Sequence, residues 1–404
     1  MKSGWQTKKL GDLCEIELGK TPARANKAFW DEKRETSNVW LSIADLLNAE
    51  DNVVVDSKEY LSDKGAAISK TVRNGTLLAS FKLTLGRLAF AGRDLFTNEA
   101  IAALTIFNER ELSKEFLFYF LHFFDWRKAA ENDVKLKGMT LNKAKLKELY
   151  VHFPPLPEQQ RIVGILDEAF AGIATAKTNA EKNLQNTRAL FESHLQSVFT
   201  QRGEGWAERR LGDVAKTQYG LSEPMNEEGK GYKIFRMGEL QGGRLIDTGR
   251  MKFANIGRAE FEKYRLRPGD VLFNRTNSFE LVGKTGIFDL PGDYCFASYL
   301  VRVLLNPKII LSAFLNYFMN SKHFQDSVKQ KASKSINQAN INATILANES
   351  VRFPESLEKQ KTIVARLDAL RSETQRLESL YQQKLAALEE LKKSLLHQAF
   401  IGQL

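Results

Sequence analysis

Side chains that could read DNA bases follow an apolar run in the second half of the sequence. The run 271–273 opens into Asn274, Arg275 and Asn277, and Lys284 follows a glycine a few residues later. An arginine can form two hydrogen bonds to guanine in the DNA major groove, and an asparagine can form two to adenine. A lysine beside a glycine suits a phosphate, because the backbone can approach closely there. This loop predicts a DNA contact, with a solvated polar loop as the alternative.

The first half carries a similar loop after its apolar run 76–79, and each half has a second polar cluster before its end. The predicted DNA contacts are, in chain order, Lys82, Thr84, Arg87, Lys137, Lys143, Asn274, Arg275, Asn277, Lys284, Lys331, Lys334, Asn337 and Gln338. The Phe-rich stretches 116–120 and 314–318 repeat phenylalanine at i, i+4, which favours buried helices over base-stacking platforms.

Motifs of catalytic and metal sites are sparse. The five histidines are scattered, and the two cysteines are too few for a thiolate metal site or a disulfide framework. Asp213, Glu228 and Lys230 have the residue types of a nuclease metal site. Such triplets are common where 27% of residues are charged, so a surface loop is the simpler interpretation. We predict no catalytic residue and no metal in this chain, with a Mg-dependent nuclease as the alternative.

The elements that must position these loops occur twice, because the sequence repeats itself. Trp5 to Asp12 reappears as Trp206 to Asp213, a shift of 201 residues. Three further matches keep nearly the same shift: 116–120 with 314–318, Leu141-Asn142 with Ile341-Asn342, and 163–167 with 364–368. Ordered matches at one shift predict two copies of one structural unit.

Each half reads as a globular part with short β-type runs, followed by a helix of about 40 residues. Apolar residues recur at three- and four-residue steps in both helices, interrupted at Lys384 in the second, and Ala176, Ala180 and Leu184 add an extra four-residue step in the first. The predicted helix contacts are Ile162, Leu166, Ile173, Leu184, Phe191, Ile363, Leu370, Leu377 and Leu388. Chain order predicts that the two helices pair antiparallel and hold two heads apart. A fragment ending near Thr200 is expected to pair with itself.

This predicts an α+β protein with two α/β heads, an antiparallel two-helix coiled coil and a pseudo-twofold internal repeat. The predicted segments are a head at 1–157, a helix and linker at 158–205, a head at 206–354 and a helix at 355–404. The formal net charge is +10; the heads carry +3 and +7, and the helical segments −1 and +1. A basic surplus confined to the heads favours nucleic acid there, and neutral helices favour protein contacts.

The motifs resemble a known family, the specificity subunit of type I restriction-modification systems. The resemblance rests on Trp-x4-Leu-Gly-Asp at the start of each half, on the runs Phe153–Val163 and Pro268–Ser278, and on the end of the chain, Ser394–Gly402. It covers essentially the whole chain. The second half departs from the family pattern at Phe353–Glu358, where the double proline is missing.

The resemblance implies a non-catalytic subunit with two target recognition domains, each reading half of a bipartite site in double-stranded DNA. The helices would set the spacer and dock two methyltransferase subunits. Those subunits would carry S-adenosylmethionine, and restriction subunits would complete the complex, so this chain itself is expected to bind no cofactor. The longest apolar stretch, about nine residues at 116–124, is too short to span a membrane, so a cytoplasmic protein is expected. The resemblance implies a prokaryotic one. The alternatives are a stand-alone DNA-binding protein, the nuclease above and a coiled-coil adaptor.

Overall fold

A computed structural model gives the fold for residues 4–131, 134–135, 138–200, 204–335 and 338–404. The chain forms two compact units. The first comprises residues 1–180 and 384–404, and the second comprises residues 181–383. Each unit therefore contains one head and a segment of each long helix, α6 (Leu156–Thr200) and α12 (Leu357–Phe400). None of the helices in the described ranges is long and apolar enough to cross a membrane.

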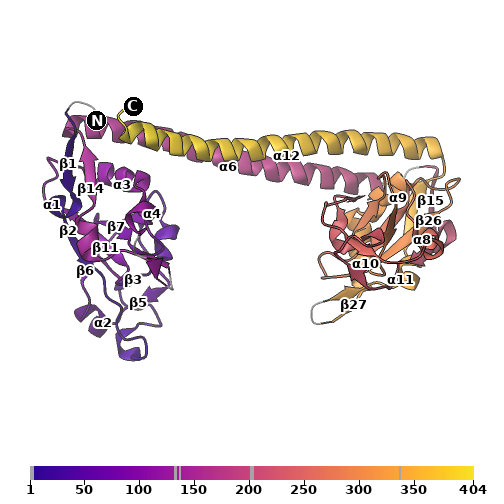
Figure 1. The fold of residues 1–404 in the computed structure, drawn as a ribbon, viewed down its shortest axis with the longest axis horizontal. Helices are drawn as coiled ribbons and strands as arrows, with labels where there is room; N and C mark the ends of the chain where they lie inside the picture. Colours follow the sequence, from indigo (N-terminus) through magenta and orange to yellow (C-terminus); the bar gives the residue numbers. More distant parts are fainter. Residues whose placement is uncertain (1–3, 132–133, 136–137, 201–203, 336–337) are drawn as a thin grey trace. The chain divides into compact units, whose positions relative to one another are not determined.

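The head of the first unit is built from four small sheets (Figure 1). A five-stranded sheet has the order β2-β11-β7-β9-β4, and a four-stranded sheet has the order β5-β3-β10-β6. The bounds of these strands, in sheet order, are Cys14–Leu18, Ile101–Ile106, Leu77–Ser80, Leu88–Ala91 and Val53–Val54, then Glu59–Tyr60, Val39–Leu41, Leu95–Thr97 and Thr71–Val72. The other two sheets are the pair β1 (Gln6–Lys9) with β14 (Tyr150–Phe153), and β12-β13-β8, at Val134–Lys135, Gly138–Thr140 and Lys82–Leu83.

The second unit repeats this plan with a larger main sheet. Its six strands follow the order β16-β26-β22-β24-β20-β19, and a four-stranded sheet follows β17-β21-β18-β25. Their bounds are Ala215–Tyr219, Leu300–Leu305, Val271–Asn274, Thr285–Ile287, Arg244–Leu245 and Leu240–Gln241, then Met225–Asn226, Lys252–Ala254, Tyr232–Phe235 and Tyr294–Phe296. The pair β15 (Trp206–Arg210) with β29 (Ser350–Pro354) and the sheet β23-β28-β27, at Thr276–Asn277, Ala339–Asn340 and Ser333–Lys334, complete it.

Short helices follow the strands in the same order in both heads. The first head has α1 (Leu10–Leu13), α2 (Asp63–Ala67), α3 (Lys114–Phe123), α4 (Trp126–Ala129) and α5 (Lys143–Lys147). The second has α7 (Leu211–Val214), α8 (Arg258–Tyr264), α9 (Ser312–Met319), α10 (Lys322–Gln330) and α11 (Ala343–Ala347). Asn142 and Asn342 explain one of the sequence matches, because each caps the helix after it, accepting an N–H bond of 2.8 Å from Lys145 and from Ile345. The predicted α+β fold with an internal repeat is confirmed.

Each head holds the start of its own long helix through a buried glutamine. The Gln159 side chain accepts from the Ser113 N–H and donates to the carbonyls of Glu111 and Pro154. Gln360 makes the same three bonds in the second unit, to the Leu311 N–H and to the carbonyls of Ile309 and Pro354. These bonds tie the start of each long helix to the segment before α3 or α9 and supply partners to main-chain groups there.

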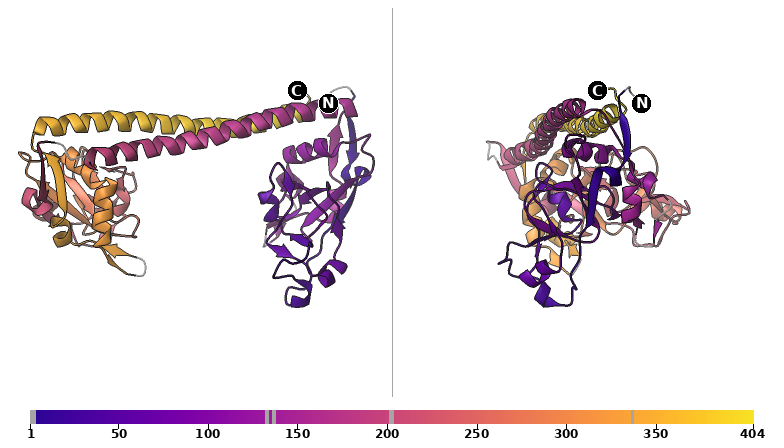
Figure 2. Two further views of the ribbon diagram at one scale, coloured as in Figure 1. Left: turned by 180° about the vertical axis from the view of Figure 1, so that it is seen from behind. Right: turned by 90° about the vertical axis from the view of Figure 1, so that its left-hand side faces the viewer.

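A phenylalanine at the end of each long helix packs into the core of a head. The end of α6 packs into the second head, and the end of α12 packs into the first. Phe199, near the end of α6, packs against Phe314 and Phe318 of α9. Phe400, at the end of α12, packs against Phe116 and Phe120 of α3. Each core therefore uses the beginning of one long helix and the end of the other. The two views in Figure 2 show the paired helices from other directions.

The structure refines the predicted helix contacts. Ile162 and Leu166 are buried in the core of the first head, so they anchor α6 to that head. Phe191 and Ile363 pack at the edge of the second core in the same way. The other predicted contacts, Ile173, Leu184, Leu370, Leu377 and Leu388, are half-buried along the helices. Leu385, rather than Lys384, is half-buried, and it gives α12 an extra four-residue step after Leu377 and Tyr381.

Candidate nucleic-acid interface

Two polar segments that are far apart in the sequence meet in one small sheet in each head. In the first, β8 pairs with β13 at Lys82 and Thr140. In the second, β23 pairs with β28 at Thr276 and Asn340. In the first head this sheet joins β8, which follows the buried strand β7, to the hairpin β12-β13 before α5. In the second head it joins β23, which follows β22, to the hairpin β27-β28 before α11. In the second head the two polar clusters that the sequence predicted separately therefore meet in one sheet.

Arg275 ties the second sheet together. Its guanidinium donates from Nη1 to the Ser298 carbonyl (3.3 Å) and from Nη2 to Oδ1 of Asn340 (3.2 Å). It also lies 5.0 Å over the ring of Tyr219, and its buried Nε has no partner among the described residues. Arg275 is half-buried, and a base contact by its guanidinium would have to replace the bond to Asn340 of β28.

The two predicted asparagines of this loop also serve its fold. Asn274 is only 1% exposed, and its Nδ2 donates to the Leu281 carbonyl at 3.4 Å. Asn277 is half-buried, and its Oδ1 accepts the Ser278 N–H at 2.8 Å. A side chain as buried as Asn274 shapes the loop without reaching a DNA groove.

The lysines around this sheet fall into two kinds. Lys331 pairs with the carboxylate of Glu349 at 2.8 Å, and that carboxylate is almost fully buried. Lys334 is exposed, with its Nζ 4.0 Å above the ring of Phe279. Lys284 is also exposed, five residues after Phe279.

Lys329, in α10, lies beside the loop that carries Phe279 and Lys284, and the charge of Lys284 acts on it. Its Nζ donates to the Glu280 carbonyl at 2.9 Å. Burial, followed by the charge of Lys284, lowers the pKa of Lys329 below its usual value. We call Lys284, Lys329 and Lys334 the cationic patch. Like charges held near one another by the fold favour an anion such as a DNA phosphate. Lys329 begins the polar cluster before α12 that the sequence predicted as a DNA contact, although it was not among the individual residues singled out there.

The predicted residues of the first head lie on a comparable loop. Lys82 is half-buried with its Nζ 5.2 Å from the Phe81 ring, Thr84 is exposed, and Arg87 donates to the Ile43 carbonyl at 3.2 Å. The hydroxyl of Ser80 shapes the turn by bonding to the Thr84 carbonyl and to the Arg87 N–H. Lys143 is exposed in the first turn of α5. Lys137 and Asn337 lie outside the described residues, and Gln338 is exposed beside the second hairpin.

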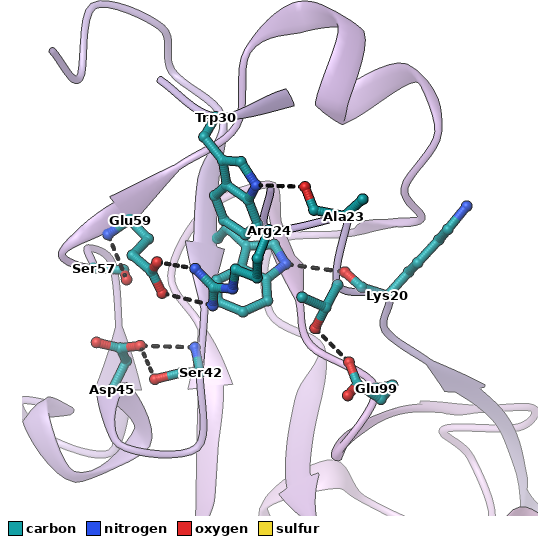
Figure 3. A network of polar contacts seen from close by, with 11 residues as sticks. Lys20, Ala23, Arg24, Trp30, Ser42, Asp45, Ser57, Glu59 and Glu99 are labelled. Atoms are coloured by element: carbon teal, nitrogen blue, oxygen red, sulfur yellow. Dashed lines mark hydrogen bonds and ion pairs between the residues drawn. The ribbon is translucent and has the colours of Figure 1, made fainter. Parts of the chain in front are cut away.

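The first head also contains a polar cluster that the sequence did not reveal (Figure 3). The Arg24 guanidinium lies 4.1 Å from the Trp30 ring and 4.6 Å from the Trp40 ring, and it forms an ion pair with Glu59. Both indole N–H groups are bonded, Trp30 to the Ala23 carbonyl and Trp40 to the Lys20 carbonyl. Because its partners come from separate strands and loops, no local spacing indicates the cluster. It lines a pocket of about 360 Å³ and fixes the loop that precedes β3.

The residues of the nuclease alternative do not assemble into a site. Glu228 and Lys230 are exposed and pair with each other, while Asp213 lies in the short helix α7. Across the described ranges, no group of three or more His, Cys, Asp or Glu side chains has the geometry to hold a metal ion. The surface-loop interpretation of this triplet fits the structure.

Comparisons with known proteins agree with this architecture. The family model of the type I restriction modification DNA specificity domain matches twice, at residues 2–185 and 203–389. The EcoBI specificity subunit of a type I restriction enzyme from Escherichia coli is 24% identical over 290 residues, which cover 65% of this chain and 60% of that subunit. The EcoKI specificity subunit of Escherichia coli K12 is 25% identical over 269 residues, covering 63% of this chain and 57% of the subunit. The chain thus spans about 60% of the length of these curated relatives.

Solved structures match the fold over its whole length. A chain from a structural study of complex assembly and conformational transition in a type I restriction-modification system has a TM-score of 0.75 and 21% identity. The match covers 100% of this chain and 99% of that one. The HsdS subunit of Thermoanaerobacter tengcongensis has a TM-score of 0.60 and 20% identity, with 100% and 98% covered. At these identities the likeness establishes the fold.

Proposed function

Because the chain belongs to the type I restriction modification DNA specificity family, we propose that it is the DNA-reading subunit of a type I restriction-modification complex. The observation that carries the proposal is the small sheet found in both heads, β8-β13-β12 and β23-β28-β27. The two sheets share one topology, and the sequences of their strands differ. Such a pair suits two different half-sites, read by one chain.

Within this proposal, the cationic patch holds the DNA backbone and the hairpins approach the bases. Lys284, just before β24, and Lys334, in β27, are exposed in the second head, where each can neutralise a phosphate. Base reading falls to side chains on the outer face of the hairpin, because Asn274 and Arg275 are engaged inside the domain. The first head offers Lys82, Thr84 and Lys143 for the same task.

The partners follow from the family. We propose that two methyltransferase subunits dock on the chain, that they carry the S-adenosylmethionine, and that restriction subunits join them in a prokaryotic cytoplasm. The leucines Leu190 of α6 and Leu391 of α12 support docking on the helices. They occupy equivalent positions of the repeat, and both are about half exposed, at 54% and 47%. This equivalent pair places one exposed leucine in each unit, and Leu380 of α12, 49% exposed, adds a further one in the second unit.

DNA binding by the assembled complex tests the proposal. Methylome sequencing of a host that carries the system gives the target, and fluorescence anisotropy then measures affinity for that duplex over a range of salt. The K284A/K334A variant should bind more weakly and lower the salt slope by about two, because each phosphate contact contributes about 0.9. K361A, which removes an exposed lysine from α12, is the matched control.

Three results would contradict the proposal. Equal affinity for target and scrambled duplexes would remove the reading role. An unchanged salt slope in K284A/K334A would show that the cationic patch does not contact DNA phosphates. Cleavage of DNA by the pure chain with Mg²⁺ would favour the nuclease alternative.

A further inference from the structure

The two long helices contact each other through four charged or aromatic pairs, two in each unit. In the first unit, Lys177 of α6 pairs with Glu389 of α12 at 2.8 Å, and Lys392 of α12 lies 4.9 Å over the ring of Phe170. The order of the contacts is reversed along the two helices, so the segments run antiparallel. Each pair joins a cation to a group that attracts it.

The second unit has two pairs of the same kind. Arg188 of α6 pairs with Glu378 of α12 at 3.1 Å, and Arg371 of α12 lies 5.2 Å over the ring of Phe191. In both units α6 therefore supplies the cation of the ion pair and the aromatic ring. In both units α12 supplies the carboxylate and the cation over the ring.

The internal repeat relates the four positions on α6 to the four positions on α12. Each α6 residue matches the α12 residue 201 positions later: Phe170 with Arg371, Lys177 with Glu378, Arg188 with Glu389, and Phe191 with Lys392. If α6 paired with a second α6, Lys177 would face Arg188 at both ends of the pair. If α12 paired with a second α12, Glu378 would face Glu389 and Arg371 would face Lys392.

Those homotypic pairs would place like charges opposite each other, which is unfavourable on a helix surface. We propose that these eight positions form a pairing code, by which α6 and α12 select each other and reject a second copy of themselves. The apolar repeat alone allows a half chain to pair with itself, and the charges oppose it. The code rests on helix contacts only, so it stands apart from the DNA-reading proposal.

The test uses the full chain with a protease site inserted after Thr200, at the end of α6. Two differently tagged batches are cleaved, mixed, unfolded in urea and refolded together, and native mass spectrometry counts the pairs. The uncut chain, taken through the same steps, controls for refolding. The wild type should return almost only complexes of one amino-terminal half with one carboxy-terminal half. Random pairing, with half of all complexes homotypic, would overturn the code.

A single charge reversal should invert the preference. With K177E, the new carboxylate repels Glu389, but it attracts Arg188 in a pair of two α6 helices. The ratio of homotypic amino-terminal pairs to mixed pairs should rise about tenfold or more, since two repulsive contacts become attractive. R188E is an independent second variant with the same expectation. K182E makes the same charge change at an exposed lysine of α6 outside the four pairs, and it should leave the ratio unchanged.

The uncut chain provides a second measurement that does not depend on refolding. K177E and E389K should each lower the melting temperature, and the double variant should recover most of the loss. An effect of K182E equal to that of K177E would overturn the proposal. Additive losses in the double variant would do the same.

Discussion

Lysines that look alike in the sequence have different tasks in the second head. Lys331 and Lys334 are three residues apart in one polar cluster, and both were predicted to contact DNA. The structure pairs Lys331 with the buried Glu349, which also accepts a bond from Ser327, whereas Lys334 is exposed over Phe279. Sequence could predict the cluster but not this division, because Glu349 reaches Lys331 only through the tertiary fold.

This difference predicts opposite effects of two neighbouring substitutions. K331A should lower the free energy of unfolding of the second unit by about 1–3 kcal/mol, because it leaves a buried carboxylate short of a partner. K334A should change it by less than about 0.5 kcal/mol. Urea unfolding followed by circular dichroism measures both. The K331A/E349Q variant should recover part of the loss, and no recovery would argue against the pair.

A second residue-scale prediction concerns acid stability in the same head. Asp247 accepts bonds from Lys233 at 2.6 Å, from Tyr294 at 2.9 Å and from the Gly249 N–H. Lys233, as the largest cause, holds the pKa of Asp247 below its usual 3.8. Because the folded pKa is the lower one, this carboxylate stabilises the fold above about pH 4, and the contribution is lost as the pH falls through the folded pKa.

The difference in unfolding free energy between wild type and D247N should therefore be largest near pH 7 and shrink below about pH 4. Denaturant titrations at pH 7, 5 and 3 measure it. D289N, at an exposed aspartate of the same head, is the control. A constant difference between wild type and D247N at all three pH values would show that Asp247 acts through something other than its charge.

At the scale of elements, the sequence predicted where single helices and strands lie, but it did not predict which strands pair in the sheets. The Phe-rich stretches 116–120 and 314–318 lie inside α3 and α9, and the runs at 76–79 and 271–273 became β7 and β22. The parallel pairs, such as β10 with β3 and β18 with β25, join strands separated by long stretches of chain. Neighbouring residues do not encode such pairs, so the meeting of the two polar clusters in one sheet was not predicted either.

The two buried glutamines give a prediction for the helix starts. Q360A removes three hydrogen bonds, one of them buried, and takes this side-chain partner from the Leu311 N–H and from the carbonyls of Ile309 and Pro354. The second unit should lose about 2–4 kcal/mol of unfolding free energy. Q159A should do the same to the first unit. Q375A, at an exposed glutamine of α12, should lie within about 0.5 kcal/mol of the wild type, and an equal loss there would count against this role.

At the scale of the whole molecule, the sequence repeat predicted two similar halves in chain order. The structure divides the chain differently, because each compact unit also takes the end of the other half's helix. The apolar spacing of α6 and α12 indicated that they pair. It gave no sign that Phe199 and Phe400 would enter the cores of the heads, since both continue the same helical pattern.

The last prediction follows from this exchange of helix ends. F199A should destabilise the second unit by about 3–5 kcal/mol, because it opens a cavity beside Phe314 and Phe318, and F400A should destabilise the first unit by about 2–4 kcal/mol. Hydrogen exchange read by mass spectrometry separates the units: F199A should speed exchange in residues 206–354, and F400A in residues 5–153. L391A, which removes an exposed leucine from α12, should change neither. Faster exchange confined to residues 5–153 in F199A, or confined to residues 206–354 in F400A, would refute the assignment of each helix end to its core.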